Sequence, residues 1–274
     1  MHKETKISIE EIDNIIDTAE DNYTKSIYSY ILKAIAIILI AGIYILIPRT
    51  FFLIPSEYTK ETIDTNKNPI IVENYENINA SNNTRQISKN KDLIEYKSLK
   101  NGDMYYIIPI AEYSISARIK EKNRFIYRQW EIDNIAVADY GLAWGDMAQD
   151  FYYKKFYTKF EQTKNGRNLV SNFKEKYFDS LFYKLDYMLT HVSHTYVIPA
   201  NKNIKKALIA AREGQSIKLD GYLIDIFSRN YRRFAMSSIS LSDINETSRG
   251  HGKDGSANEV MYVTKVQIGD KVFK

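Results

Sequence analysis

One stretch of apolar residues, Ser26 to Ile54, constrains this chain more than any other feature. A helix needs about 20 mostly apolar residues to cross a bilayer. Ile27 to Ile47 supplies that length with a single charge, Lys33, which lies close enough to the N-terminal end for its ammonium group to reach the membrane surface. The sequence therefore predicts one transmembrane helix over residues 26–54. The alternative is a buried helix in the core of a soluble protein.

The charges that flank this run do not decide its direction. Four lysines precede or begin the apolar core and three basic residues follow it, namely Lys3, Lys6, Lys25 and Lys33, then Arg49, Lys60 and Lys67. The positive-inside rule therefore gives almost no preference. A single span followed by a large C-terminal domain is the usual signal-anchor arrangement. On that basis we expect a single-pass protein of the bacterial inner membrane, with its C-terminal domain in the periplasm or otherwise outside the cytoplasm.

Composition narrows the chemistry that the chain can use. The 274 residues include no cysteine, which excludes disulfides, thiolate metal sites and cysteine nucleophiles. The overall formal charge is +4, but residues 91–274 hold 29 basic and 22 acidic side chains. A basic domain in a chain with 22 tyrosines is able to contact anionic lipid, glycan or nucleic acid. An ordinary solvated surface explains the same composition.

The chain divides into four predicted segments. Residues 1–25 form an acidic cytoplasmic segment, within which Ser8 to Ala19 has the spacing of a short amphipathic helix that could dock a partner. Residues 26–54 are the span. Residues 55–90 are rich in Asn, Thr, Glu and Lys and predict a polar linker. Residues 91–274 are long enough to bury the core of one soluble domain.

The pattern from Lys91 onward predicts an α+β domain. Alternation of apolar and polar residues over 113–119 is typical of a half-buried strand. Further strands are predicted at 125–132, 135–144, 216–226, 233–241 and 260–268, and a strand or helix at 152–160. Helices are predicted at 173–189 and 203–212, the second ended by Gly214. Gly221 indicates a bulge or tight bend. We expect a small curled, mostly antiparallel, barrel-like sheet with two inserted helices.

Three segments together resemble a group of uncharacterised bacterial single-pass membrane proteins with a C-terminal extra-membrane α+β domain. The segments are AVADYGLAWGDM (136–147), HVSHTYVIPANKNIKKALIAAREGQSIKLDGYLIDI (191–226), and SSISLSD with EVMYVTKVQI (237–268). They follow that group's pattern of WG, HxIPAN, GYLV and SSxxRxDxGxG over about 130 residues. The resemblance implies a membrane anchor and an extra-membrane domain, and it carries no assigned activity. The chain departs from the pattern at Leu241 and Ala257, where the group tends to have arginine and cysteine.

Candidate catalytic residues cluster at 191–194. His191 and His194 lie three residues apart, near the expected end of a helix, and could share a face and bind a metal with His251 or Asp254 as a third ligand. No spacing matches a known zinc signature, so we expect neither a metal nor a cofactor. Ser193 beside His194 suggests a nucleophile and its base, although the G-x-S-x-G elbow is missing.

Two basic groups are candidate ligand-binding residues. Arg249, His251 and Lys253 lie in the glycine-rich loop 249–255, which could form an anion-binding nest or simply a hairpin tip. Arg229, Arg232 and Arg233 lie beside two aromatic residues, a combination that is able to stack on and pair with nucleic acid or sugar.

Three function hypotheses follow from these observations. The first is a membrane-anchored, non-enzymatic interaction module with protein partners in a bacterial envelope complex. The second is a membrane-tethered hydrolase or metal-dependent enzyme that uses His191, His194 or His251. The third is a nucleic-acid-binding domain on a membrane anchor. The sequence favours the first because no convincing catalytic set is present.

Overall fold

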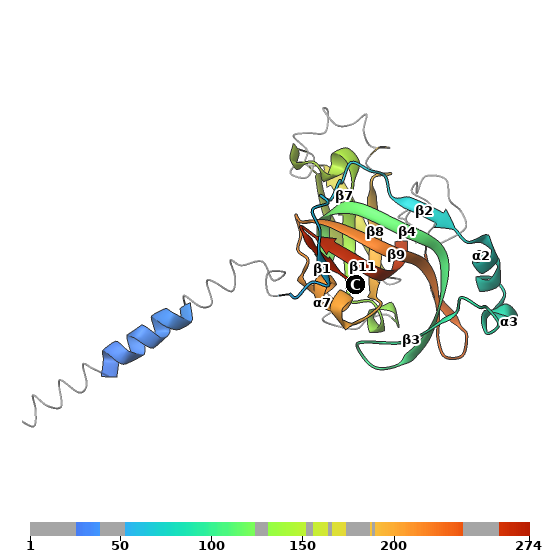
Figure 1. Ribbon diagram of the computed structural model, residues 1–274, viewed down its shortest axis with the longest axis horizontal. Coiled ribbons are helices and arrows are strands. Elements are labelled where there is room, and N and C mark those ends of the chain that lie inside the picture. The colour runs from blue at the N-terminus through green and yellow to red at the C-terminus, as the bar shows by residue number, and fades with distance from the viewer. Residues whose placement is uncertain are drawn as a thin grey trace, which may run out of the picture. The chain divides into compact units, whose positions relative to one another are not determined.

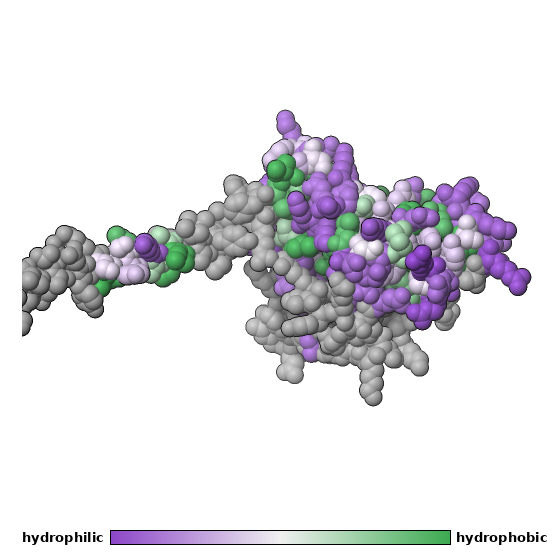
Figure 2. All heavy atoms as spheres, turned by 90° about the horizontal axis from the view of Figure 1, so that it is seen from below, coloured by the Kyte–Doolittle hydropathy of each residue, from purple (hydrophilic) through white to green (hydrophobic). Residues whose placement is uncertain are grey.

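The computed structural model describes residues 26–38, 53–123, 131–151, 156–163, 166–173, 187, 190–237 and 258–274. The chain falls into two compact units, Met1–Phe52 and Leu53–Lys274. In the first unit, residues 26–38 form a helix whose large apolar side chains are exposed, as the green surface in Figure 2 shows. Within the described ranges, no helix is long and apolar enough to cross a membrane. Residues 39–52 of the predicted span and the expected helix at Ser8 to Ala19 lie outside the described residues.

The second unit is α+β, as predicted, and consists mostly of sheet (Figure 1). Its strands are β1 (Glu57–Tyr58), β2 (Ile70–Glu73), β3 (Ile94–Lys97), β4 (Met104–Asn123), β5 (Ala138–Ala143), β6 (Phe156–Thr163), β7 (Gly166–Phe173), β8 (Val192–Pro199), β9 (Ser216–Phe227), β10 (Arg233–Met236), β11 (Asn258–Ile268) and β12 (Lys271–Phe273). Its helical elements are α2 (Tyr75–Ser81), α3 (Thr84–Ile87), the 3-10 turns η2 (Glu131–Asn134) and η3 (Gly145–Ala148), and α7 (Lys202–Ala210).

Five of these strands pair in a ring. The order is β4, β5, β8, β11 and β9, and the ring closes because β9 pairs with both β11 and β4. All these pairings are antiparallel except the one between β8 and β11. Strands β2 and β3 pair with β4, β10 pairs with β9, and β1 and β12 extend the sheet from β11. β6 and β7 form a separate hairpin.

The larger hydrophobic core lies inside this ring, since all five strands contribute to one cluster of buried side chains. Each strand contributes alternate residues, as the period of two requires. Among the largest fully buried side chains of the described chain are Tyr113, Tyr140 and Trp144. A second cluster lies on the other side of the sheet, around Tyr196, Ile198 and residues of β3 and β9.

Helix α7 lies between β8 and β9 in the sequence and packs its apolar side on the larger core. Its first turn is capped by Asn201, whose side-chain oxygen accepts hydrogen bonds from the backbone N–H groups of Asn203 and Ile204. At its other end the Lys122 ammonium group donates to the backbone carbonyls of Leu208 and Ile209, each at 2.8 Å. A cation at this end complements the helix dipole. The IPAN motif is therefore a strand end followed by a helix cap.

The segment predicted as a linker, residues 55–90, differs from the expectation. β1 pairs with β12, and β2 pairs with β4 from Ile70↔Ser114 to Glu73↔Ala111. The folded unit accordingly begins at Leu53 and not at Lys91. Sequence pattern missed these strands because they have only two and four residues and pair with strands that are distant in the chain. In Figure 1, α2 and α3 follow β2 at the edge of the sheet.

Several predicted elements are present at the expected places. The predicted helix 203–212 corresponds to α7, and the predicted strands at 113–119, 216–226 and 260–268 lie within β4, β9 and β11. The αL cap predicted at Gly214 is not formed, because the helix ends at Ala210 with Ala211 as its C-cap; Gly214, with φ of 82°, lies in the turn before β9. Two further predictions were wrong: the residues that follow His191 form strand β8 and not a helix end, and residues 131–132 begin the 3-10 turn η2. Most of the predicted helix 173–189 lies outside the described residues.

Gly221 is required where β9 meets β11. A Cβ atom built on it would overlap the backbone carbonyl oxygen of Tyr262 and would lie 3.1 Å from the Cα atom of Val263. The pairing of β9 with β11 shifts register at this point, between Val263 and Lys265. An irregular pairing is therefore present beside Gly221, as predicted, but its extra residue, Thr264, lies on β11 and not on β9.

We predict that Gly221→Ala lowers the free energy of unfolding by about 1–3 kcal/mol, because backbone atoms must move to admit the methyl group. The chain in detergent micelles should be unfolded with denaturant while a spectroscopic probe of β-structure is followed. Ser216→Ala, at an exposed position of the same strand, serves as the matched control and should change the stability little. An unchanged stability for Gly221→Ala would contradict the close approach at this residue.

Candidate binding groove

Strands β2, β4 and β9 present two adjacent rows of side chains on the outer face of the ring. The strand register sets Val72 opposite Glu112, and Glu112 opposite Tyr222. The next row sets Ile70 opposite Ser114, and Ser114 opposite Asp220. Tyr113, between the two rows on β4, is 2% exposed and belongs to the larger core. The sheet therefore sorts core residues to one face and these side chains to the other.

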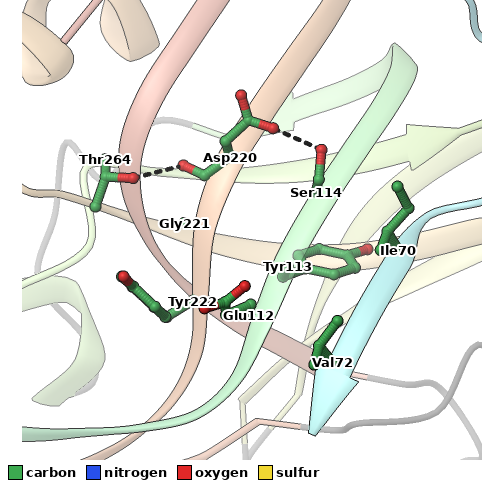
Figure 3. Close-up of a pocket in the computed structure, with 9 residues that line it drawn as sticks. All are labelled: Ile70, Val72, Glu112, Tyr113, Ser114, Asp220, Gly221, Tyr222 and Thr264. Carbon is green, nitrogen blue, oxygen red and sulfur yellow. Dashed lines mark hydrogen bonds between the residues drawn. The ribbon is translucent and has the colours of Figure 1, made fainter. Parts of the chain in front are cut away.

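Two adjoining pockets lie along this face. The smaller has a volume of about 320 Å³ and lies over Ile70, Ser114, Asp220 and Thr264 (Figure 3). The larger has a volume of about 580 Å³ and is bounded by β4, β9 and the segment from β2 to β3. Both are lined by Val72, Glu112 and Tyr222. We call the two pockets together the outer groove.

Hydrogen bonds organise the floor of the smaller pocket. The Ser114 hydroxyl donates to Oδ1 of Asp220 at 2.5 Å, and the Thr264 hydroxyl donates to the backbone carbonyl of Asp220 at 3.1 Å (Figure 3). The Lys265 ammonium nitrogen lies 3.6 Å from Oδ2 of Asp220. The charge of Asp220 is thus offset locally. Glu112 differs, since it is exposed and no cation of the described residues lies within 4.0 Å of its carboxylate.

A buried asparagine holds the wall of the larger pocket in place. Asn77 of α2 donates from its side-chain nitrogen to Oδ2 of Asp92 at 3.0 Å and to the backbone carbonyl of Pro109 at 2.7 Å. Its oxygen accepts a hydrogen bond of 2.9 Å from Asn90. Asn77 is 2% exposed. These bonds therefore replace the hydrogen bonds to water that its side chain loses on burial. These bonds connect α2 to the segment that precedes β3 and to β4, and they hold this wall of the pocket in place.

Ser193 and His194 cannot act as nucleophile and base on each other. They are neighbours on strand β8, so their side chains point to opposite faces. The Ser193 hydroxyl lies 2.9 Å from the Thr195 hydroxyl, on the core side. Nε2 of His194 lies 2.5 Å from Oδ1 of Asp139 on the other side, and both of these side chains are 1% exposed or less. The histidine is therefore part of a buried polar pair that joins β8 to β5.

The core side of β8 carries a second buried polar group. Glu259 of β11 is 2% exposed and accepts hydrogen bonds from the Tyr113 hydroxyl at 2.9 Å and the Thr195 hydroxyl at 2.7 Å. Burial, and then the adjacent Glu259 carboxylate, raises the pKa of Tyr113 well above its usual value. The phenol consequently stays protonated and remains a donor. This network joins β4, β8 and β11 inside the ring.

His191 belongs to an aromatic cluster around the WG motif. Its ring stacks on Tyr187 with 3.6 Å between centroids, and its Nδ1 lies 2.8 Å from the Tyr187 backbone carbonyl. The Tyr187 hydroxyl accepts a hydrogen bond of 3.0 Å from the Asp146 backbone N–H, and Gly145, with φ of 58°, leaves room for that hydroxyl. Burial lowers the pKa of His191, opposed by its bond to Tyr187 and by Asp146. Residue 191 thus anchors the turn before β8.

The predicted arginine cluster is largely occupied by structural contacts. Arg232 lies 3.1 Å from Glu131, and Arg233 donates to the Asn82 side chain at 3.0 Å and lies 3.8 Å from Asp225. Tyr231, with φ of 56°, stacks on Tyr106 at 4.7 Å between centroids. Arg229 is exposed. The contacts of Arg232 and Arg233 hold the turn between β9 and β10, while all three arginines remain exposed.

The remaining predicted site residues, Arg249, His251, Lys253 and Asp254, lie outside the described residues. In the part of the chain that the structure describes, no three His, Asp or Glu side chains come together as metal ligands would. The predicted pair of metal-binding histidines is not formed on one helix face, because His191 lies in the turn before β8 and His194 lies on the strand.

No protein-family model, curated protein or solved structure matches this chain.

The outer groove was not predicted from the sequence. Its residues come from four strands that are far apart in the chain, and β2 had been assigned to a linker. The available signal was the alternation of polar and apolar residues at 112–114, which is typical of a two-faced strand; residues 70–73, Ile-Ile-Val-Glu, do not alternate. Alternation does not show which strands will be neighbours.

We predict that His191 makes stability depend on pH. Because folding lowers the pKa of His191 below its ordinary value of 6.5, the folded state resists protonation, and stability falls as pH drops below about 6.5 until the lowered pKa is passed. The loss on acidification from about pH 7.5 to about pH 5 should therefore be smaller in His191→Gln than in the parent chain. Thermal unfolding at each pH measures this, and parallel pH profiles for the two proteins would contradict it.

Proposed function

We propose that this protein is a membrane-anchored, non-enzymatic interaction module that presents its folded unit to a protein partner, as a component of a bacterial envelope assembly. The observation that carries the proposal is the outer groove. It is the surface of the described unit where exposed apolar side chains, a tyrosine and an unpaired carboxylate meet.

The rim of the groove exposes two large apolar side chains of one strand. Ile70 is 63% exposed and Val72 is 56% exposed, both on the four-residue strand β2. On the face of the unit seen in Figure 2, hydrophilic residues predominate and apolar residues form smaller patches. Apolar side chains gathered beside a groove are typical of a surface that a partner covers.

In the described part of the chain the candidate catalytic residues do not assemble into a catalytic set, which supports a non-enzymatic role. A nucleophile needs a base within about 2.6–3.2 Å, oriented by a third group. His194 has an orienting carboxylate in Asp139, but Ser193 points to the opposite face and the pair is buried. His191 is engaged by Tyr187. The contacts of all three candidate residues are those of residues that hold the sheet together.

The apolar run at residues 26–54 supports the membrane anchor. It has the length and composition of a span, and residues 26–38 are helical with exposed apolar side chains such as Leu32, Ile37 and Ile38. Side chains of this kind on an isolated helix are stabilised by lipid and disfavoured in water.

Nucleic-acid binding is the second candidate, and one observation favours it. The ring order β4-β5-β8-β11-β9, with α7 between its third and fourth strands in the sequence, resembles the connectivity of OB-folds, many of which bind oligonucleotides. Those folds bind on the face of their second and third strands, here β5 and β8. On that face the described residues are buried: Leu169 of β7 covers Gly141, and His194 pairs with Asp139. This candidate therefore ranks below the first.

The direction of the anchor separates the two candidates. We expect a C-terminal fusion to a phosphatase that folds only after export to be active, and a fusion to a reporter that requires the cytoplasm to be inactive, since a single span with a large C-terminal domain is exported as a signal anchor. Matched fusions at residue 25 should give the reverse pattern. A C-terminal domain found in the cytoplasm would remove the envelope role and move nucleic-acid binding to first place.

We predict that the groove contacts a protein in cells that produce this chain. A photo-crosslinking amino acid placed at Ile70, exposed in the groove, should give an adduct of defined mass on illumination. The matched control is the same amino acid at Glu95, which is exposed on β3 and does not line either pocket. Equal adducts from both positions, or no adduct from Ile70, would argue against a partner in the groove.

A further inference from the structure

The outer groove has a charge that sets it apart from the rest of the folded unit. From residue 53 to the C-terminus the chain carries 33 basic and 27 acidic side chains. The described residues that line the two pockets nevertheless include four carboxylates, from Glu73, Asp92, Glu112 and Asp220, and no lysine, arginine or histidine. A hollow lined by charges of one sign concentrates their electrostatic field, because its walls have a low dielectric constant. The groove is therefore an acidic region on a basic unit.

The negative charge is unevenly divided between the two pockets. In the smaller pocket Lys265 and Ser114 approach the Asp220 carboxylate at 3.6 Å and 2.5 Å and offset its charge. In the larger pocket Asp92 receives a neutral amide donor from Asn77, and Glu73 is close enough to raise the pKa of the Tyr75 phenol through a hydrogen bond. Neither contact supplies a positive charge. Among the described residues, the carboxylates of the larger pocket are therefore the ones that no cation offsets.

The apolar side chains of the larger pocket suit the stem of a long cationic side chain. Val72, Ile94 and Tyr222 line it together with the carboxylates. The methylene groups of lysine or arginine pack on such surface while the charged end reaches the carboxylates, and an ammonium or guanidinium group is also attracted by the face of a tyrosine. The smaller pocket has Ile70 and Val72 on its wall, and Lys265 offsets the charge of Asp220 there. It therefore suits a short apolar side chain.

The spacing of the pockets indicates a peptide and not a single small cation. The pockets adjoin along β4, where Pro109 and Ala111 line the larger one, Ser114 lines the smaller one and Glu112 lines both. Residues two apart on a strand are separated by about 7 Å. Side chains two residues apart on an extended peptide have the same spacing. The geometry points to an extended segment of a partner protein that places a lysine or arginine in the larger pocket and a small apolar residue, two positions away, in the smaller one. This inference rests on the proposed function and names the chemistry of its partner.

The test uses the full chain in micelles of an uncharged detergent. The probe is a fluorescent peptide of repeated Lys-Ser-Val-Ser units, which presents lysine and valine alternately on one face, and the matched probe replaces lysine with glutamate. We expect the lysine peptide to bind, more weakly as salt is raised, and the glutamate peptide not to bind. Glu112→Gln should lower the affinity for the lysine peptide about threefold to fivefold. Glu95→Gln, which removes an exposed carboxylate outside the groove, should leave affinity unchanged.

A second variant guards against an effect on folding. Val72→Lys, at an exposed position between the pockets, places an ammonium group of the chain itself beside Glu112. It should lower the affinity for the lysine peptide more than Glu112→Gln does. Thermal unfolding of each variant shows whether the fold is retained. Equal losses in Glu112→Gln and Glu95→Gln, equal binding of both peptides, or binding that Val72→Lys leaves intact would overturn the inference.

The outcomes also separate this inference from the proposed function. If photo-crosslinking at Ile70 yields a protein adduct but the lysine peptide fails to bind, the groove has a partner of a different chemistry and only the cationic peptide is rejected. If the adduct is a second copy of this chain, the cationic partner is likewise rejected. If crosslinking fails as well, the interaction role of the groove fails with it.

Discussion

The double pairing of strand β9 is the constraint on which the rest of the folded unit depends. β9 pairs with β4 along one edge and with β11 along the other, and these contacts close the ring. Closure requires β11 to come so near at Gly221 that no side chain fits between them. Once the ring is closed, alternate residues of its five strands meet in one core, and the residues between them form the outer face. The core and the groove are therefore two sides of the same pairing.

The polar residues that looked catalytic in the sequence are used to hold this ring together. A buried carboxylate is costly unless hydrogen bonds satisfy it, and Glu259 receives two, from Tyr113 and Thr195. On the other face of β8, His194 and Asp139 satisfy each other across the sheet. Each pair links strands that are distant in the chain. Such buried polar contacts favour one strand register over its alternatives, because a shifted register would leave the partners unsatisfied.

Prediction from the sequence succeeded where local pattern and local chemistry agree. α7 has both a helical stripe and an N-cap in Asn201, and β9 and β11 have long alternating runs. It failed where the partner decides the structure. Ile70–Glu73 is too short to be recognised as a strand until β4 is placed beside it, and Val192–Pro199 follows a helical pattern although its β-branched and aromatic residues suit a strand. The groove follows from these same pairings, and so it escaped prediction too.

By itself the sequence determined the apolar run at residues 26–54, the lack of any cysteine chemistry and the α+β character of the C-terminal part, because these depend on composition and on periodicity within one segment. Only the tertiary structure decided that Ser193 and His194 face away from each other, that the arginines near residue 230 are engaged by Glu131, Asn82 and Asp225, and that Val72, Glu112 and Tyr222 form one row. The physical reason is that strand pairing joins residues far apart in the chain, as Val72 and Glu112 are, or Glu57 and Val272. No local pattern encodes which of the possible neighbours will be chosen.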